Sequence, residues 1–518
     1  MSLNGKAAIV GAHEHPTRLA THLSVVRLHA DVAKGALEDA GLDKRDIDGY
    51  FCAGDAPGLG TNTVAEYLGL KLRHVDSTEC GGSAPLLHVA HAAEAIAAGR
   101  CSIALVTLAG RPRAAMEESK AAAMGTDKGK SGPPRTALKP PDPDAPEIAF
   151  ELPYGPATQN LYAMVAKRHM HEFGTTGEQL AWIKVAASRH AQHNPHAMLR
   201  KVVTVEEVVN SPMVSDPLRR LDCCVMSDGG GAVIVARPEI ARELSRESGR
   251  PVVMVRGTGE APKHGMGGFM DLTYSAAAWS GPLAFAEAGV TPADIQYASL
   301  YDSFTITVLM QLEDLGFCKK GEGGRFVMDG NLISGVGKLP FNTDGGGLCN
   351  NHPANRGGIT KVIEAVRQLR GEAHPKVQVP NCDIALAHGT GGLHLVQFAA
   401  ADETVFQQRG VAGHLTDADK YHIGCARQIN HPAHRGQGVE GGVLFRGGAD
   451  HRHGHRVMRR ADLVGNPHHH VKEAGRTIRR DIADQRDKAV LLRLHRRHRI
   501  HHAAQRPPGA IGGLVIAM

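Results

Sequence analysis

An internal repeat is the feature that most limits how this 518-residue chain can fold. The stretch EDAGLDKRDI at 38–47 has the pattern of AEAGVTPADI at 286–295: a helix of small residues ends at Ala-Gly, and Asp-Ile follows after a turn. A second pair, at 91–106 and at 361–387, repeats an amphipathic helix followed by Cys-x-Ile-Ala-Leu. Glycine suits the left-handed position that ends a helix. Two repeats in the same order predict two homologous halves.

Each half alternates strand and helix patterns, which predicts an α/β fold with mixed sheets covered by helices. A chain of this length also exceeds the size at which one core stops growing. The expected elements of the first half are a strand at 7–12, helices near 23–40 and 84–98, and a strand at 102–109. Those of the second half are a strand at 251–257 and helices near 275–288, 302–315 and 358–370.

We expect the first half to span 1–245 and the second half 246–400. Residues 111–150 are rich in Pro, Lys, Ala and Gly, which predicts a long excursion over the surface. Helices near 156–172 and 178–193 follow it. The excursion and these helices then form a loop domain over about 111–200, inserted in the first half.

Residues 401–518 differ in composition from the rest. They hold 20 Lys and Arg against 11 Asp and Glu, and 14 of the 31 histidines, without helical or alternating periodicity. The formal net charge of +6 belongs to this tail, so it does not indicate nucleic-acid binding by the body. We expect disorder or isolated helices such as 472–496, histidine clusters without a true metal site, and LHLVQF at 393–398 as the last strand of the fold. A shifted reading frame near residue 393 is one hypothesis for this abrupt change in composition.

No apolar run reaches the roughly 20 residues that cross a bilayer, and the N-terminus has no secretory pattern. We therefore expect a cytoplasmic protein. Nine cysteines without a C-x-x-C pair predict reduced thiols, with no disulfide and no structural zinc. The cluster MSDGGGAVIVAR at 226–237 runs into a strand, so it is not a phosphate loop, and no nucleotide signature occurs elsewhere.

Two glycine-rich segments carry a candidate nucleophile and a candidate base. Cys80 in STECGGSAP stands before a helix, where the helix dipole favours the thiolate. A buried structural cysteine is the alternative. His352 in NNHPANRGG precedes the next helix, and the repeat alignment sets it opposite Gly82. It is a candidate general base for the thiol, or alternatively a helix cap.

Two further segments complete the set. In LYDSFTITVL, Asp302 is interpreted as the cap of the helix that follows, whereas Tyr301 and Ser303 stay open as reactive groups. In ALAHGTGGLHL, His388 ends a strand and is followed by Gly-Thr-Gly-Gly, whose backbone amides could face a developing oxyanion. A tight turn without a function is the alternative for that segment.

In this order on a duplicated α/β chain, the four segments resemble the thiolase superfamily, and within it the sterol-carrier-protein type. The resemblance covers roughly residues 5–400. In that family a cysteine at a helix start takes the acyl group, a Gly-His-Pro histidine activates it, and an H-D-C-F motif and a late H-N-x-G-x-G-G turn complete the site. The resemblance therefore implies acyl-CoA chemistry, with NHP, YDSF and HGTGG in the places of the last three motifs.

Two departures from the family pattern bear on the reaction. Counted back from Gly99, which ends the helix, the family's spacing puts the nucleophile at Gly82 and not at Cys80. Ser303 replaces the cysteine of H-D-C-F, and its hydroxyl is too weak an acid to match a thiol. A related branch uses tyrosines to cleave β-hydroxyacyl-CoA by a retro-aldol step, and Tyr301 would suit that role.

Three functions stay open from the sequence. The first is an acyltransferase that makes or breaks a carbon-carbon bond in an acyl-CoA thioester. The second is a retro-aldolase on a β-hydroxyacyl-CoA, and the third is a noncatalytic scaffold that binds acyl-CoA. The resemblance implies coenzyme A as substrate or product with no other bound cofactor, a homodimer, and a small zinc-containing OB-fold subunit as a partner.

Overall fold

The computed structural model describes residues 2–53, 56–123, 157–263, 270–353, 357–391 and 511–517. These residues belong to one compact unit. None of the helices in this part of the chain combines the length and the apolar character needed to cross a membrane.

The first half and its insertion contain β1 (Ala8–Glu14), α1 (Val25–Ala40), β2 (Gly49–Phe51), α2 (Thr61–Leu68), β3 (His74–Asp76), α3 (Ala84–Ala97), β4 (Ile103–Gly110), α4 (Pro112–Ala123), α6 (Thr158–Phe173), α7 (Gly177–Ala191), α8 (Val205–Val209), β5 (Met213–Ser215), β6 (Leu218–Arg219), β7 (Gly229–Ala236) and α9 (Pro238–Ser248). The second half contains β8 (Val252–Gly259), α10 (Ala277–Ala288), β9 (Tyr297–Leu300), α11 (Thr305–Asp314), α12 (Gly323–Phe326), α13 (Gly346–Cys349), α14 (Gly358–Arg370), β10 (Ile384–His388) and β11 (Ile511–Ala517).

One mixed sheet runs through both halves in the order β3-β2-β4-β7-β1-β8-β11-β10-β9. In the first half β7 is antiparallel to β4 and β1, whereas β2 is parallel to both β3 and β4. The strands of the second half all run parallel. The halves join where β1 meets β8 in antiparallel register at Ala8↔Met254 and Ile9↔Val253. The predicted α/β class with mixed sheets is confirmed.

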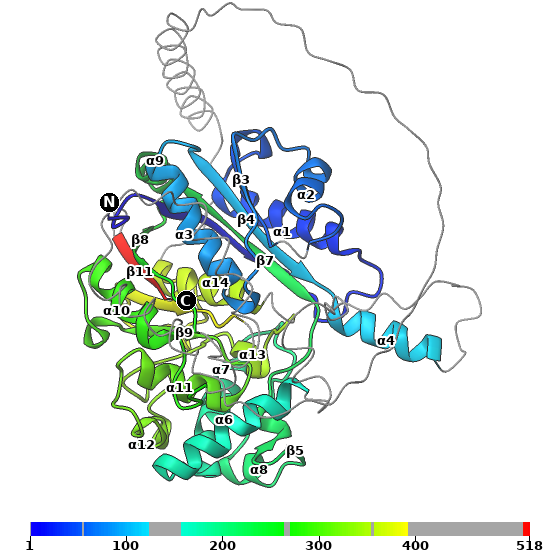
Figure 1. Ribbon diagram of the computed structural model, residues 1–518. Coiled ribbons are helices and arrows are strands. Elements are labelled where there is room, and N and C mark those ends of the chain that lie inside the picture. The colour runs from blue at the N-terminus through cyan, green and yellow to red at the C-terminus, as the bar shows by residue number, and fades with distance from the viewer. Residues whose placement is uncertain are drawn as a thin grey trace, which may run out of the picture. The chain divides into compact units, whose positions relative to one another are not determined.

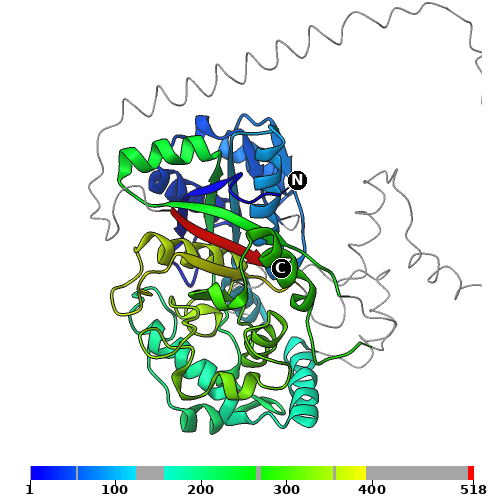
Figure 2. The same ribbon diagram turned by 90° about the vertical axis from the view of Figure 1, so that its left-hand side faces the viewer.

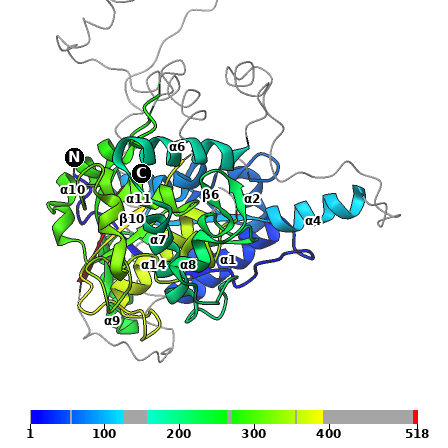
Figure 3. The ribbon, with the colours of Figure 1, turned by 90° about the horizontal axis from the view of Figure 1, so that it is seen from below.

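Helices cover both halves of this sheet and fill the space between them. One core combines α3 and α14 with inward-facing residues from strands of both halves, and both helices are labelled in Figure 1. A second core places α1, α2 and α9 on the outer face of the first half. A third packs α6, α7, α10 and α11 against the second half, on the side seen from below in Figure 3. Helices therefore pack on both faces of the sheet in each half.

The repeat found in the sequence is present in the fold. Helix α1 ends at Gly41 and α10 ends at Gly289, each with φ of 69°, and a single 3-10 turn follows each. Only a residue without a Cβ adopts this left-handed conformation without strain. The Ala-Gly pair therefore ends the helix at the same place in both halves.

The insertion differs in one respect from the expectation. Residues 112–123 form α4, with Ala114 and Ala115 buried, where the sequence predicted irregular surface chain. The helix forms because alanines and long polar residues, which favour helices, precede the proline-rich stretch. The rest of the excursion, 124–156, lies outside the described residues. The two helices expected next are present as α6 and α7.

The largest departure from the sequence-based prediction is β11. The stretch IGGLVIA at 511–517 lies in the middle of the sheet, parallel to β8 on one side and β10 on the other. In Figure 2 it is the red strand between green β8 and yellow β10. The expectation that the whole of 401–518 stays out of the fold is therefore wrong for these seven residues. The remaining tail, the proposed last strand at 393–398 and the helix at 472–496 lie outside the described residues.

The composition of β11 explains its place. Parallel strands buried on both faces read as nearly continuous apolar runs, and Leu514 to Ala517 are completely buried. A side chain at Gly512 would lie 3.2 Å from Leu369, and one at Gly513 2.9 Å from Arg256. Glycine therefore permits the close approach of neighbouring side chains. The boundaries at 245 and 400 stay predictions.

Candidate active site

The four segments singled out in the sequence meet around Gly82. A Cβ added there would overlap the ring of Tyr301 and lie 2.6 Å from the carbonyl oxygen of Thr390. A Cβ at Gly358, the first residue of α14, would overlap the carbonyl oxygen of Gly82. One at Gly389 would lie 2.8 Å from the Cα of Ser83. The turn before α3 is thus enclosed by the YDSF segment, the start of α14 and the HGTGG turn.

Cys80 lies at this meeting point, in a buried setting that does not favour the thiolate. It precedes a 3-10 turn, Gly81–Ser83, that separates it from the first turn of α3. Its thiol is hydrogen-bonded to the Ser83 hydroxyl at 3.3 Å. Burial raises the pKa of the thiol to about 12, which opposes the expected thiolate. Among the described residues no hydrogen bond joins Cys80 to His352, so the predicted nucleophile and base pair is not formed.

His352 pairs instead with Tyr301. Their rings stand edge to face, with centroids 5.4 Å apart and planes at 68°. Burial lowers the pKa of His352 to about 4, so the ring is neutral at physiological pH. Its Nε2 is buried and has no hydrogen-bond partner within the described residues. Burial also raises the pKa of Tyr301 well above its ordinary value, which keeps the phenol protonated. Both groups are therefore neutral at physiological pH.

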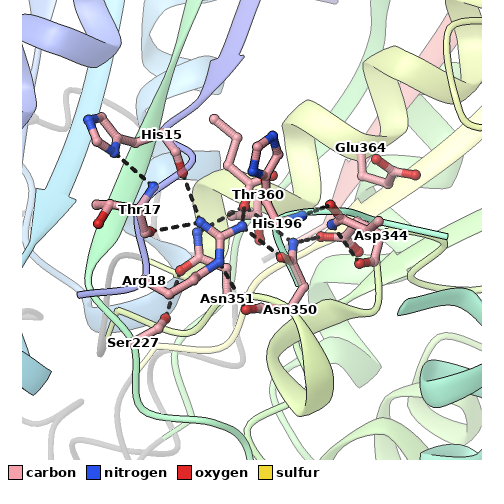
Figure 4. A network of polar contacts seen from close by, with 12 residues as sticks. His15, Thr17, Arg18, His196, Ser227, Asp344, Asn350, Asn351, Thr360 and Glu364 are labelled. Atoms are coloured by element: carbon pink, nitrogen blue, oxygen red, sulfur yellow. Dashed lines mark hydrogen bonds and ion pairs between the residues drawn. The ribbon is translucent and has the colours of Figure 1, made fainter. Parts of the chain in front are cut away.

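A polar network holds the turn that carries His352 (Figure 4). Arg18, after β1, donates to the carbonyl oxygen and to the side-chain oxygen of Asn350, at 3.1 and 2.7 Å. Ser227 donates to the side-chain oxygen of Asn351 at 2.7 Å and accepts from the backbone N-H of His352 at 2.8 Å. Three consecutive residues are therefore fixed by side chains from the first half.

His388 ends β10, next to the turn that faces Gly82. Its Nδ1 lies 2.7 Å from Oε1 of Gln311, on α11, and its Nε2 is buried without a hydrogen-bond partner among the described residues. Burial lowers the pKa of His388 to about 3. The turn was predicted to offer backbone N-H groups to an oxyanion. The N-H of Gly389 does not fit that role, because it donates to the carbonyl oxygen of Ala517 in β11 at 3.2 Å.

Asp302 does not cap its own helix. The first residue before α11 is Phe304, which makes no side-chain cap. The Asp302 carboxylate instead accepts from the backbone N-H groups of Gly347 and Leu348 in α13, at 2.8 and 3.0 Å, and forms a buried ion pair with Lys361 at 2.6 Å. The predicted cap is therefore wrong. Asp302 ties the YDSF segment to the segment that carries His352.

The side chain of Ser303 contacts residues other than Tyr301. Its hydroxyl is 3.2 Å from that of Thr307, one turn further along α11. It also forms a hydrogen bond with Tyr162 of α6, whose pKa burial raises to about 12. The ring of Tyr162 is stacked on Phe304, with centroids 4.5 Å apart. Ser303 thus faces the inserted helices.

The sequence analysis did not identify three residues that help to form the site: Gln311, Tyr162 and Cys224. Burial is the main cause of the raised pKa of Tyr301, and Cys224 and Tyr162 are electrostatic neighbours that raise it further. Only Gln311 carried a signal in the sequence. It is the one amide within the apolar run TITVLMQL, where a polar side chain is buried and needs hydrogen-bond partners.

The chain resembles several known proteins. A family model described as thiolase C-terminal domain-like matches residues 259–401. Acetyl-CoA acetyltransferase of Methanothermobacter thermautotrophicus is 33% identical over 366 residues, which cover 69% of this chain and 89% of that protein. The 17-hydroxy-3-oxo-4-pregnene-20-carboxyl-CoA lyase of Mycobacterium tuberculosis is 35% identical over 403 residues, 75% of this chain and 97% of that protein. A solved structure described as the Ltp2-ChsH2(DUF35) aldolase has 32% identity and a TM-score of 0.63, and the match covers 73% of this chain and 93% of that chain.

The layered fold and the turn at which four segments meet define a thiolase-like protein. The chain belongs to the thiolase superfamily, and sterol carrier protein 2 of Oryctolagus cuniculus is 32% identical to it over 257 residues, 46% of that protein. The family resemblance drawn from the sequence is confirmed. The roles of Cys80, Tyr301, Ser303, His352 and His388 stay predictions, although the structure brings the segments that carry them together.

Proposed function

We propose that this protein cleaves the bond between the α and β carbons of a β-hydroxyacyl-CoA thioester by a retro-aldol step. The position of the Tyr301 ring is the observation that supports this proposal. Its ring fills the space that a side chain at position 82 would need, and position 82 is where the family's spacing puts the acyl-accepting nucleophile. A phenol therefore replaces a thiol at the centre of the site.

The neutral groups of the site suit this reaction. A base takes the proton of the β-hydroxyl, the O-H electron pair forms a carbonyl, and the Cα–Cβ pair becomes the enolate of the shortened acyl-CoA. An acid then protonates that enolate. Tyr301 is protonated and the imidazoles of His352 and His388 are neutral at physiological pH, so the site holds an acid and two candidate bases. The step consumes neither free coenzyme A nor any further cofactor.

Two relatives support a lyase. One is named as the lyase of a 17-hydroxy steroid carboxyl-CoA, and the Thermomonospora curvata protein named steroid side-chain-cleaving aldolase is 33% identical over 91% of its length. We propose a bulky, branched β-hydroxyacyl-CoA of that class as the substrate. Acyl transfer through Cys80 is the second candidate, since an acetyl-CoA acetyltransferase is 33% identical.

The purified chain should convert such a β-hydroxyacyl-CoA to a ketone and a shortened acyl-CoA without added coenzyme A, as measured by mass spectrometry. Cys80→Ala should keep this activity. Cleavage of a β-ketoacyl-CoA that needs free coenzyme A and is lost in Cys80→Ala would identify an acyltransferase instead. Binding of acyl-CoA without either reaction would identify a scaffold.

We also propose two protein contacts. The solved aldolase is described with a second component, ChsH2(DUF35), so a small partner subunit should be co-expressed in the assay.

Strand β3 is the edge of the sheet and exposes Val75 at 44%, which supports a homodimer through that edge. Light scattering of the purified protein measures this directly: a monomer at micromolar concentration would count against the dimer.

A further inference from the structure

Hydrogen bonds fix the orientation of the side-chain amide of Gln311. It lies on α11 and is 1% exposed. Its side-chain nitrogen donates to two backbone carbonyl oxygens, that of Tyr301 at 2.6 Å and that of Thr307 at 2.9 Å. Carbonyl oxygens only accept, so the amide nitrogen and not the amide oxygen must face them. The amide oxygen is therefore the atom that faces Nδ1 of His388, at 2.7 Å.

This orientation determines the tautomer of His388. An amide oxygen only accepts, so Nδ1 must carry the hydrogen of this 2.7 Å bond. In a neutral imidazole the second nitrogen then has a lone pair and no hydrogen. Burial keeps the ring neutral, with a pKa of about 3. Nε2 of His388 is thus a hydrogen-bond acceptor, buried and without a partner among the described residues.

The same amide holds the backbone of Tyr301. Gln311 consequently joins Tyr301, whose ring covers Gly82, to His388, the first residue of the HGTGG turn that packs on the same Gly82 turn. The Gln311 side chain therefore holds the backbone carbonyl of Tyr301, the candidate acid, and also determines which nitrogen of His388 carries the hydrogen. His352 has no such constraint from Gln311.

We infer that Gln311 is a positioning residue that makes Nε2 of His388 the proton acceptor of the carbon-carbon cleavage, an inference that rests on the proposed function. Nε2 takes the β-hydroxyl proton as the Cα–Cβ bond breaks and the carbonyl forms. Tyr301 gives its phenolic proton to the α carbon of the enolate. The proton on Nε2 returns to the Tyr301 oxygen after the products leave, which restores both groups.

The direct test is the tautomer itself. In the full chain labelled with ¹⁵N-histidine, long-range ¹H–¹⁵N spectra of wild type and His388→Gln identify the His388 signals by difference. We expect Nδ1 protonated and Nε2 unprotonated between pH 6 and 8. A protonated Nε2 in the wild-type protein would overturn the inference. This measurement needs no substrate, so it is independent of whether the proposed reaction occurs.

The kinetic test removes the amide. Gln311→Met keeps the volume of the side chain but frees Nδ1, and we expect kcat to fall by about 100-fold, within the range of a lost acid-base group, with KM changed less than about 2-fold. Gln368→Met is the matched control, because Gln368 is equally buried and its amide nitrogen also donates to two oxygens, of Thr343 and Val377. It should lower the melting temperature and leave kcat within about 2-fold.

The outcomes separate the two proposals. Wild-type kcat in Gln311→Met would overturn the positioning role even if the lyase reaction is found. Absence of lyase activity in the wild-type protein would overturn the proposed function, and the proton-acceptor role with it. An unprotonated Nε2 would in that case support only the fixed tautomer. If Gln311→Met does not fold, the spectra of the wild-type protein still decide the tautomer.

Discussion

Tyr301 is the residue whose hydroxyl separates the two candidate reactions. Tyr301→Phe keeps the ring over Gly82 and removes the proton donor, so we expect kcat for β-hydroxyacyl-CoA cleavage to fall by about 10²- to 10⁴-fold with an unchanged melting temperature. Steady-state kinetics and calorimetry measure both. Tyr67→Phe is the control, since Tyr67 is 57% exposed on α2. Retention of more than about a tenth of the activity would exclude a direct role for the phenol.

Cys80 provides an independent prediction at the same scale. A pKa of about 12 leaves only about one thiolate in 10⁴ at pH 8. Iodoacetamide should therefore leave Cys80 unmodified in the folded chain at pH 8, and should label it once the chain is unfolded, as read by peptide mass spectrometry. The labelled fraction rises with pH because only the thiolate reacts. Rapid, selective labelling of Cys80 that acyl-CoA prevents would restore the acyl-enzyme mechanism.

The sequence predicted some residues of this site and not others, for a physical reason. Tyr301, His352 and His388 stand next to glycine-rich turns, and such turns mark a place where backbone and ligand approach closely. Asp302 was misinterpreted because a carboxylate before a helix suggests a local cap, whereas its hydrogen-bond donors come from α13, some 45 residues away along the chain. Gln311 becomes informative only when its partner on β10 is known. Contacts distant in sequence leave no local pattern.

The Gly82 turn is the element on which the arrangement of the site depends. Gly82→Ala puts a methyl group into the Tyr301 ring and near the Thr390 carbonyl. We expect a loss of about 1–3 kcal/mol in the free energy of unfolding from overpacking, and a loss of activity as the ring is displaced. Urea denaturation and kcat measure the two effects.

Gly177→Ala is the matched control for that substitution. Gly177 is the first residue of α7, and a methyl group there would meet only Val209, at 3.9 Å. The change should be neutral or slightly stabilising, by about 0.4–1 kcal/mol. If both alanine variants behave alike, the close packing of the Gly82 turn has no functional consequence.

Most elements could be predicted because local pattern and fold agree. Helices α1, α3, α10 and α14 lie within a few residues of the expected ranges, since apolar periodicity and the glycines that end three of them mark their limits. Strand β11 could not be placed. Its apolar run is visible in the sequence, but nothing local shows that it enters the sheet after residues of unrelated composition.

At the scale of the whole molecule, the second half of the sheet depends on residues 511–517. Strand β11 separates β8 from β10, and without it β8 loses its neighbour on that side. The carbonyl oxygen of Ala517 accepts from the N-H of Gly389, directly after His388. The central strand therefore supports both the core and the turn that faces Gly82.

Truncation tests this dependence. A chain that ends after residue 400 lacks β11, and we expect loss of cooperative thermal unfolding and of activity, because a central parallel strand with a completely buried run is removed. A chain that lacks only 403–485 keeps β11 and should retain both. A synthetic peptide of sequence IGGLVIAM, added during refolding of the truncated chain, should restore part of the activity. Full stability of the chain that ends after residue 400 would show that β11 is not part of the functional sheet.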